Sequence, residues 1–133
     1  MRLSIGVPAY NQGSYLAETL ESLLNQETPF HEIVVSNNHS TDSTAEVLES
    51  FAGRVRVVTP PKHLTMAGNW NFTISQLTGD WISLLSSDDL ALPNFARSVT
   101  TALQTVPEIK RSTEPLIRDF LSETLSLLEP EAK

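Results

Sequence analysis

Short apolar runs alternate with amphipathic stretches along residues 3–107 of the chain. Each apolar run is bounded by turn residues and has the length of a buried strand. After each run, apolar residues recur every three or four positions, which is the spacing of a helix with one buried face. We therefore expect strands at 3–7, 32–35, 55–58 and 81–85, each followed by a helix.

Individual residues indicate where these elements should begin and end. Pro8 is expected to stop the first strand, because proline has no N–H to donate to a sheet. Ser14 is a candidate cap of the first helix, and Ser43 with Glu46 has the spacing of a capping box before the second. Gly79 is expected to terminate the third helix as a C-cap.

The alternation of strands and helices predicts an α/β fold, with a mostly parallel sheet and helices on both faces. Ligands of such sheets bind beyond the carboxyl ends of the strands. The polar segments expected at that edge are 8–11, 36–42, 86–89 and the stretch after Val58 that contains Lys62 and His63.

The alternation ends at Pro107, where another strand would be due. Residues 108–133 instead show the spacing of one amphipathic helix. We therefore predict one domain over 1–107 and a divergent helical tail over 108–133, which covers an open part of the sheet or pairs two chains in a homodimer. The apolar face of this helix would consist of Ile117, Phe120, Leu121, Leu125 and Leu128.

Composition narrows the class of protein further. The chain has 133 residues, no cysteine and a net charge of -7, from 9 basic and 16 acidic residues. The length fits a single domain, and the lack of cysteine excludes disulfides and thiolate zinc sites. The acidic balance argues against a nucleic-acid partner. No apolar run reaches the length of a membrane span, so we expect no transmembrane segment. The absence of cysteine fits the reducing cytoplasm, where we expect the protein.

The glycines give no phosphate-binding loop. None of the five belongs to the pattern of a dinucleotide-binding turn or of a P-loop. A diphosphate at the sheet edge would therefore need a cation. Asp88 and Asp89 follow the last predicted strand directly and offer the hard oxygen ligands that Mg²⁺ and Mn²⁺ prefer. The alternative from the residues alone is a turn in which one of the two caps the next helix.

Two other segments have both a structural and a functional interpretation. Residues 36–42 suit either a turn that caps the next helix or an array of amides that reads the edge of a base. Tyr10 either stacks on a flat ligand or covers the core. The three histidines, His31, His39 and His63, lie too far apart in sequence to indicate a metal cluster.

Taken together, these segments resemble the family 2 glycosyltransferases, which are inverting enzymes with the GT-A fold. The resemblance spans residues 2–107, and its pieces occur in the order of the family. It implies a GT-A fold that binds a nucleotide sugar. The matching pieces are 4–11, 32–42, 67–71 and 79–89.

The resemblance also implies roles for individual residues. The end of the first strand would contact the nucleoside, with Tyr10 against the base, and Asn38 would hydrogen-bond the base. The family usually has acidic residues where this chain has Asn37 and Asn38, but an amide oxygen still accepts from an imide N–H such as that of uracil. The implied nucleotide-binding residues are Pro8, Ala9, Tyr10, Asn11, Asn37, Asn38, Asn69 and Asp88.

Asp88 and Asp89 match the acidic motif that holds Mn²⁺ or Mg²⁺ in the family, with Asp89 favoured as the direct ligand and Asp88 nearer the ribose or sugar. The implied reaction is hexosyl transfer with inversion, from a nucleotide sugar (UDP-sugar first) to an acceptor hydroxyl on a saccharide, lipid or protein. The resemblance further implies cell-envelope polysaccharide synthesis in the cytoplasm, peripheral to the inner face of the membrane. The matched residues include no general base.

Two hypotheses from other classes stay open beside this one. A non-catalytic nucleotide-sugar-binding module would have the same site without turnover. An interaction protein would dock to a partner through the predicted terminal helix, and it would show itself by association in solution.

Overall fold

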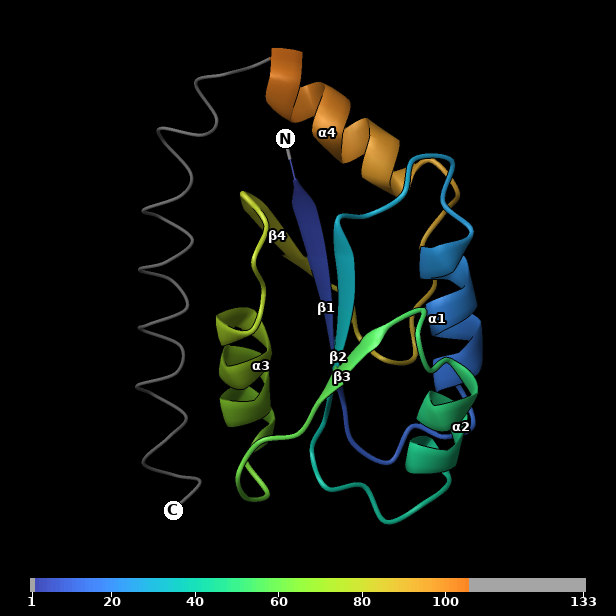
Figure 1. Cartoon of the computed structure of the whole chain (residues 1–133), viewed down its shortest axis with the longest axis vertical. Coiled ribbons are helices and arrows are strands. Elements are labelled where there is room, and N and C mark those ends of the chain that lie inside the picture. Colours follow the sequence, from blue (N-terminus) through green and yellow to red (C-terminus); the bar gives the residue numbers. More distant parts are fainter. Residues whose placement is uncertain (1, 106–133) are drawn as a thin grey trace.

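A computed structural model describes residues 2–105 of the chain, so the predicted tail helix and its homodimer contact lie outside the described residues. Strands and helices alternate throughout this part, as the sequence predicts (Figure 1). The elements are β1 (Leu3–Ala9), α1 (Leu16–Leu24), β2 (Glu32–Asn37), α2 (Thr44–Ser50), β3 (Arg56–Val58), α3 (Met66–Ser75), β4 (Trp81–Leu84) and α4 (Phe95–Thr105).

Within residues 2–105 the strands form one parallel sheet in the order β3-β2-β1-β4. Helices α1 and α2 cover one face of this sheet and α3 covers the other (Figure 1). The predicted α/β class, with a parallel sheet between helices, is therefore confirmed. The chain moves outward from β1 to β3 and then returns to the other side of β1, which creates a topological switch point between β1 and β4. Ligand sites of open α/β sheets form at such points.

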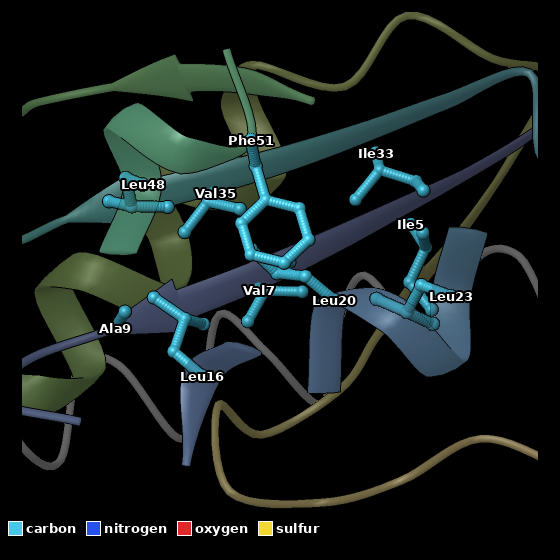
Figure 2. Packing of buried hydrophobic residues seen from close by; sticks show 10 residues of the cluster. All are labelled: Ile5, Val7, Ala9, Leu16, Leu20, Leu23, Ile33, Val35, Leu48 and Phe51. Carbon is cyan, nitrogen blue, oxygen red and sulfur yellow. The ribbon is translucent and has the colours of Figure 1, made fainter. Parts of the chain in front are cut away.

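The main core lies between the sheet and the helices α1 and α2 (Figure 2). Leucines spaced along one side of α1 are buried against alternate residues of β1 and β2, as the helical spacing predicts. Each buried side chain of this size contributes about 1.5–3 kcal/mol to folding. The cluster consists of Ile5, Val7, Ala9, Leu16, Leu20, Leu23, Ile33, Val35, Leu48 and Phe51.

The opposite face of the sheet depends on a glycine. A Cβ placed on Gly6 of β1 would lie 2.6 Å from Cγ2 of Thr73 in α3 and 3.0 Å from Cδ2 of Leu84 in β4. Both distances are shorter than ordinary van der Waals contacts, and Thr73 is fully buried. The lack of a side chain at Gly6 therefore allows α3 to pack directly on β1.

Pro8 does not stop β1, which continues to Ala9, so this prediction was wrong. Backbone groups along a strand alternate between its two sides. The Gly6 carbonyl accepts from Leu85 N–H on the β4 side, and the Ala9 carbonyl accepts from Asn38 N–H on the β2 side. Pro8 lies two residues after Gly6, so its nitrogen faces the β4 side, where β4 has already ended. The strand therefore loses no hydrogen bond at the proline.

The predicted cap at Ser14 was also wrong. Helix α1 has Tyr15 at its N-cap position, and no side chain caps the helix there. The Gln12 carbonyl instead accepts from the N–H groups of Tyr15 and Leu16, at 3.0 and 2.9 Å. A backbone turn thus replaces the side-chain cap.

The predicted capping box before α2 was wrong in its partners. Ser43 occupies the N-cap position, but its side chain makes no capping bond. Asp42, one residue earlier, accepts from Thr44 N–H at 2.9 Å through Oδ1. The carboxylate therefore satisfies a helix N–H that the box of Ser43 and Glu46 was expected to satisfy.

Gly79 is not the C-cap of α3, because the helix ends at Ser75 and Gln76 occupies the C-cap position. A Cβ on Gly79 would lie 2.5 Å from Ser4 Oγ and 2.8 Å from the Arg2 carbonyl oxygen. The glycine N–H also donates to Ser4 Oγ at 2.8 Å. Gly79 is thus required for the close approach of the β4 entry to β1.

A network around Glu32 joins the strands at the amino edge of the sheet. Its carboxylate accepts from Ser4 Oγ at 2.7 Å, from Thr78 Oγ1 at 2.8 Å and from Arg56 Nη2 at 3.2 Å. Burial raises the pKa of this carboxyl group, but the hydrogen bonds from these residues outweigh it and lower the pKa to about 2. The charged form is therefore the one that the fold stabilises.

Glu32→Gln is expected to lower the free energy of unfolding by about 2 kcal/mol at pH 7, the scale of hydrogen bonds to a charged group. Because the folded-state pKa lies below the ordinary value of 4.5, this contribution is present above pH 4.5 and is lost as the pH falls toward about 2. Urea unfolding at pH 7, 4.5 and 3 measures the difference. Exposed Glu49→Gln is the control, and a Glu32→Gln deficit that stays constant with pH contradicts the assignment.

None of the helices described within residues 2–105 combines the length and the hydrophobicity of a membrane span.

Candidate functional site

A cavity of about 410 Å³ opens at the carboxyl edge of the sheet, where β1, β2 and β4 end. Segments that are far apart in sequence meet around it: the end of β1, the loop before α3, the first turn of α3 and the loop after β4. The cavity therefore lies at the edge that the sequence predicts. Of the predicted site residues, Pro8, Ala9, Tyr10, Asn38, Asn69 and Asp88 line it, whereas Asn11, Asn37 and Asp89 are not among its lining residues.

Tyr10 follows β1 directly and is 44% exposed. Its ring lies 4.9 Å from the ring of His63, measured between centroids, with the planes tilted by 59°. Both rings line the cavity. Tyr10 is thus not a core residue, and it presents an aromatic surface to the cavity.

Asn11 joins two loops outside the cavity. Its backbone is left-handed, with φ of 52°, a conformation that asparagine tolerates better than most residues. Its Oδ1 accepts from Thr41 N–H at 2.7 Å, and its own N–H donates to Ser40 Oγ at 3.0 Å. The side chain therefore fixes the loop after β1 to the loop after β2.

Asp42 strengthens the same connection. Its Oδ2 accepts from Gly13 N–H at 3.0 Å, while Oδ1 accepts from Thr44. Hydrogen bonds from the Thr44 side chain and from Gly13 N–H hold the pKa of Asp42 below its ordinary value. The two loops beside the cavity are therefore bound together by polar contacts.

Asn38 is only 3% exposed and pairs with the main chain of Leu64. Its Nδ2 donates to the Leu64 carbonyl and its Oδ1 accepts from Leu64 N–H, both at 2.8 Å. The carbonyl of Asn38 also lies 3.1 Å from Nδ1 of His63. The residue therefore holds the loop before α3 against the end of β2.

The residues beside Asn38 form the turn that leaves β2. Asn37 Oδ1 accepts from Ser40 N–H at 3.2 Å, and His39 between them is left-handed, with φ of 56°. His39 Nε2 lies 2.8 Å from the carbonyl oxygen of Pro60, which can only accept, so this nitrogen carries the hydrogen. The structure thus uses Asn37 to shape the turn.

Asn69 fixes α3 to β2. Ser36 Oγ donates to its Oδ1 at 2.6 Å, and Asn69 Nδ2 donates to the Ser36 carbonyl at 3.4 Å. The helix begins at a side-chain cap, since Thr65 Oγ1 accepts from Gly68 N–H at 3.0 Å. These bonds place the first turn of α3 at the cavity wall.

The acidic pair lies in a loop that is anchored to α1. Thr19 Oγ1 donates to the Ser87 carbonyl at 3.0 Å, and Asp89 N–H donates to the Ser86 carbonyl at 3.1 Å. Both carboxylates are exposed, and neither makes a hydrogen bond or an ion pair with any residue in 2–105. They are therefore available to a ligand, and neither serves as a cap.

The carboxylates suit a divalent cation that keeps most of its water. Among the described residues, no group of three or more histidine, cysteine or acidic side chains is placed to hold a metal. Mg²⁺ and related ions in such sites are bound by one or two carboxylates together with substrate phosphates. The donor set of Asp88 and Asp89 therefore fits Mg²⁺ or Mn²⁺ that arrives with a phosphorylated ligand.

Several cavity residues carry no sequence signal of their own. Sequence reasoning placed Lys62 and His63 at this edge, but the contact of His63 with Tyr10 joins residues that are distant in the chain. Leu64 lies in the loop before α3 and Met66 begins the helix, and apolar residues at such positions would be interpreted as core or surface. The lining residues that belong to none of the segments singled out from the sequence are Gln12, Leu64, Thr65 and Met66.

The parallel sheet with its cavity at the switch point has the architecture of nucleotide-binding α/β domains. Residues 4–108 match the model of Glycosyl transferase family 2, and the chain belongs to this family. The resemblance inferred from the sequence is thus confirmed.

Two relatives illustrate how much of the family the chain covers. It is 32% identical over 105 residues to glycosyltransferase GlyG of Streptococcus pneumoniae, an alignment of 77% of this chain and 35% of that protein. It is 36% identical over 95 residues to chondroitin synthase of Pasteurella multocida, covering 69% of this chain and 10% of that protein. The chain thus spans about a third or less of the relatives' length.

Solved structures show the same fold. TarS of S. aureus in complex with UDP-GlcNAc superposes with a TM-score of 0.72 and 26% identity, over 79% of this chain and 32% of that one. The mannosyltransferase PcManGT of Pyrobaculum calidifontis, in complex with GDP-Man and Mn²⁺, superposes with a TM-score of 0.69 and 23% identity, over 77% and 32% of the two chains. The predicted GT-A fold is therefore confirmed.

Proposed function

We propose that residues 1–107 form the nucleotide-sugar-binding domain of an inverting hexosyltransferase that uses a UDP-sugar. The observation that carries this proposal is the shared cavity of Tyr10 and Asp88, which brings together an aromatic surface and a carboxylate that makes no hydrogen bond or ion pair within residues 2–105. An aromatic ring suits a base, and a carboxylate suits a metal-bound diphosphate. TarS, a relative of the same fold, has been solved with UDP-GlcNAc and supports the choice of donor.

A divalent ion, Mn²⁺ or Mg²⁺, would be held by Asp89 and Asp88 and would neutralise the charge that builds up on the departing nucleoside diphosphate. The hydrogen bond from Thr19 to the Ser87 carbonyl anchors the main chain beside these two residues to α1. Pro8, Ala9 and Tyr10 would contact the nucleoside at the end of β1, and Asn69 would support that side of the cavity. Asn11 and Asn37 would act through the loops that they shape.

The acceptor hydroxyl belongs to a saccharide, lipid or protein in this proposal, and it must lose its proton to a general base. We place the reaction in the cytoplasm, peripheral to the inner membrane face, in the synthesis of a cell-envelope polysaccharide. One relative by sequence, TarS of Staphylococcus aureus, is a poly(ribitol-phosphate) β-N-acetylglucosaminyltransferase, which supports a polymer acceptor of this kind.

Binding of UDP is expected to require the metal and the acidic pair. Calorimetry with UDP should give an affinity at least about tenfold higher with Mn²⁺ than with chelator, and Asp88→Asn and Asp89→Asn should each remove most of this gain. Exposed Glu46→Gln is the matched control and should bind like the wild type. Equal UDP affinity with Mn²⁺, with chelator and in both aspartate variants would contradict the metal role.

Turnover separates an enzyme from a module that only binds. The measurement is release of UDP from UDP-GlcNAc with Mn²⁺, with and without saccharide acceptors. Release that depends on Asp89 supports the transferase, whereas donor binding without release by the 133-residue chain supports the non-catalytic module.

A further inference from the structure

The contact between His63 and Asn38 defines how the imidazole is protonated. His63 Nδ1 lies 3.1 Å from the main-chain carbonyl oxygen of Asn38. A carbonyl oxygen can only accept, so Nδ1 must carry the hydrogen. In the neutral ring, Nε2 then has a lone pair and acts as an acceptor.

The ring that carries this acceptor lines the cavity. His63 is exposed and lines the cavity beside Tyr10, whose ring lies 4.9 Å away. Within residues 2–105, only Nδ1 of the ring makes a hydrogen bond, and Nε2 makes none. An incoming ligand therefore meets an oriented acceptor next to an aromatic surface.

The side chain of Asn38 is less suited to this task. Its Nδ2 and Oδ1 each already make a 2.8 Å hydrogen bond to the main chain of Leu64, and the residue is 3% exposed. Using either atom for a ligand would compete with the bonds that hold the wall in place. Asn38 thus orients the ring through its main-chain carbonyl and leaves Nε2 of His63 to face a ligand.

We propose that His63 determines base specificity in the donor site, its Nε2 accepting a hydrogen bond from the N3–H of uracil. This inference rests on the proposed function, because it concerns the base of the nucleotide bound there. Cytosine has an unprotonated N3 that can only accept, so the neutral ring with hydrogen on Nδ1 would reject it at this position. Asn38 becomes a positioning residue in this arrangement.

Two substitutions separate base recognition from support of the wall. In His63→Asn, the side-chain amide nitrogen is separated from Cβ by the same number of bonds as Nδ1 of the histidine. It can therefore still donate to the Asn38 carbonyl, but the shorter side chain has no atom in the place of Nε2. In His63→Gln, the side-chain amide oxygen and nitrogen are separated from Cβ by the same number of bonds as Nε2 of the histidine. The amide oxygen can therefore accept a hydrogen bond from the ligand where Nε2 would. A purely structural histidine would therefore be rescued by Asn, and a base-reading histidine by Gln.

The experiment measures the affinities for UDP and CDP by calorimetry in Mn²⁺, with thermal melts to verify that each variant is folded. We expect the wild type and His63→Gln to bind UDP more tightly than CDP. In His63→Asn, the ratio of the UDP affinity to the CDP affinity should fall about fivefold, the scale of one neutral hydrogen bond. His31→Asn, at the amino edge, is the control and should keep the preference. Long-range ¹H–¹⁵N spectra should show the hydrogen of the neutral His63 ring on Nδ1.

The binding measurements distinguish a failure of the proposed function from a failure of the role of His63. A wild type that binds neither nucleotide overturns the proposed function and this inference with it. UDP binding with a full preference over CDP in His63→Asn overturns the role of His63 alone, and so does a neutral ring with its hydrogen on Nε2.

Discussion

Gly6→Ala is expected to lower the free energy of unfolding by about 1–3 kcal/mol, the usual cost of adding volume to a packed interior. The new Cβ would lie 2.6 Å from Thr73 Cγ2, and Thr73 cannot turn away cheaply because its Oγ1 donates to the Asn69 carbonyl at 2.7 Å. Helix α3 must therefore move away from β1. Since Asn69 and the first turn of α3 line the cavity, UDP affinity should fall as well.

Thr73→Ser provides the matched test of this explanation. Serine keeps the hydroxyl that bonds to the Asn69 carbonyl and removes Cγ2, the atom nearest to the new Cβ. Urea unfolding of both single variants and the double variant should give a favourable coupling energy of about 1 kcal/mol, because the pair is in direct contact. Simple additivity of the two substitutions would show that α3 does not limit the space at Gly6.

Asn38→Asp is expected to destabilise the domain by about 1–3 kcal/mol at pH 7, the cost of leaving a buried polar group without its partner. The resemblance to the family alone would suggest that an acidic residue is tolerated here. In this structure, however, a carboxylate would lose the bond from Nδ2 and place its charge against the Leu64 carbonyl. The loop before α3 should loosen, and nucleotide affinity should fall with it.

The sign of the pH effect follows from the same contact. A protonated carboxyl group can donate to the Leu64 carbonyl while it accepts from Leu64 N–H, so the fold favours the protonated form and raises the pKa of the new group. The deficit of Asn38→Asp relative to the wild type should therefore shrink as the pH falls through the raised folded-state pKa toward the ordinary aspartate value of about 4, and it should level off below that value.

Asn37→Asp is the matched control for this substitution. Its Oδ1 only accepts from Ser40 N–H, which a carboxylate does equally well. Urea unfolding between pH 4 and 7 measures both variants. Equal stability of Asn38→Asp and the wild type across this range would refute the structural role of the Asn38 amide.

The local pattern of the sequence was enough to predict the alternation of strands and helices and the parallel sheet. Helical spacing predicted one buried side for α1, and Leu16, Leu20 and Leu23 are buried there, because periodicity is a property of neighbouring positions. The place of the acidic pair also followed, since parallel strands bring their carboxyl ends to one edge. Asp88 and Asp89 were thus predicted at the edge where the cavity lies.

Residue types alone were a poor guide wherever a partner comes from a distant segment. Pro8 remains inside β1 because β4 ends before reaching it, and Asp42, which also accepts from Gly13 N–H in the loop after β1, replaces the predicted capping box at α2. Gly79 looked like a helix terminator, but it is needed where the chain passes Ser4. In each case the deciding contact joins segments whose proximity is set by the sheet order.

For the candidate site too, the sequence predicts which residues lie at the edge of the sheet, and the tertiary structure shows which contacts they make. The chain order and local pattern place Tyr10, Asn38 and Asp88 at one edge, because each follows a strand of the same parallel sheet. Only the folded chain shows that the Asn38 amide is paired with Leu64 and that His63 stands beside Tyr10. An amide or an imidazole can both donate and accept, so its chemistry is defined by the partner that the tertiary structure supplies.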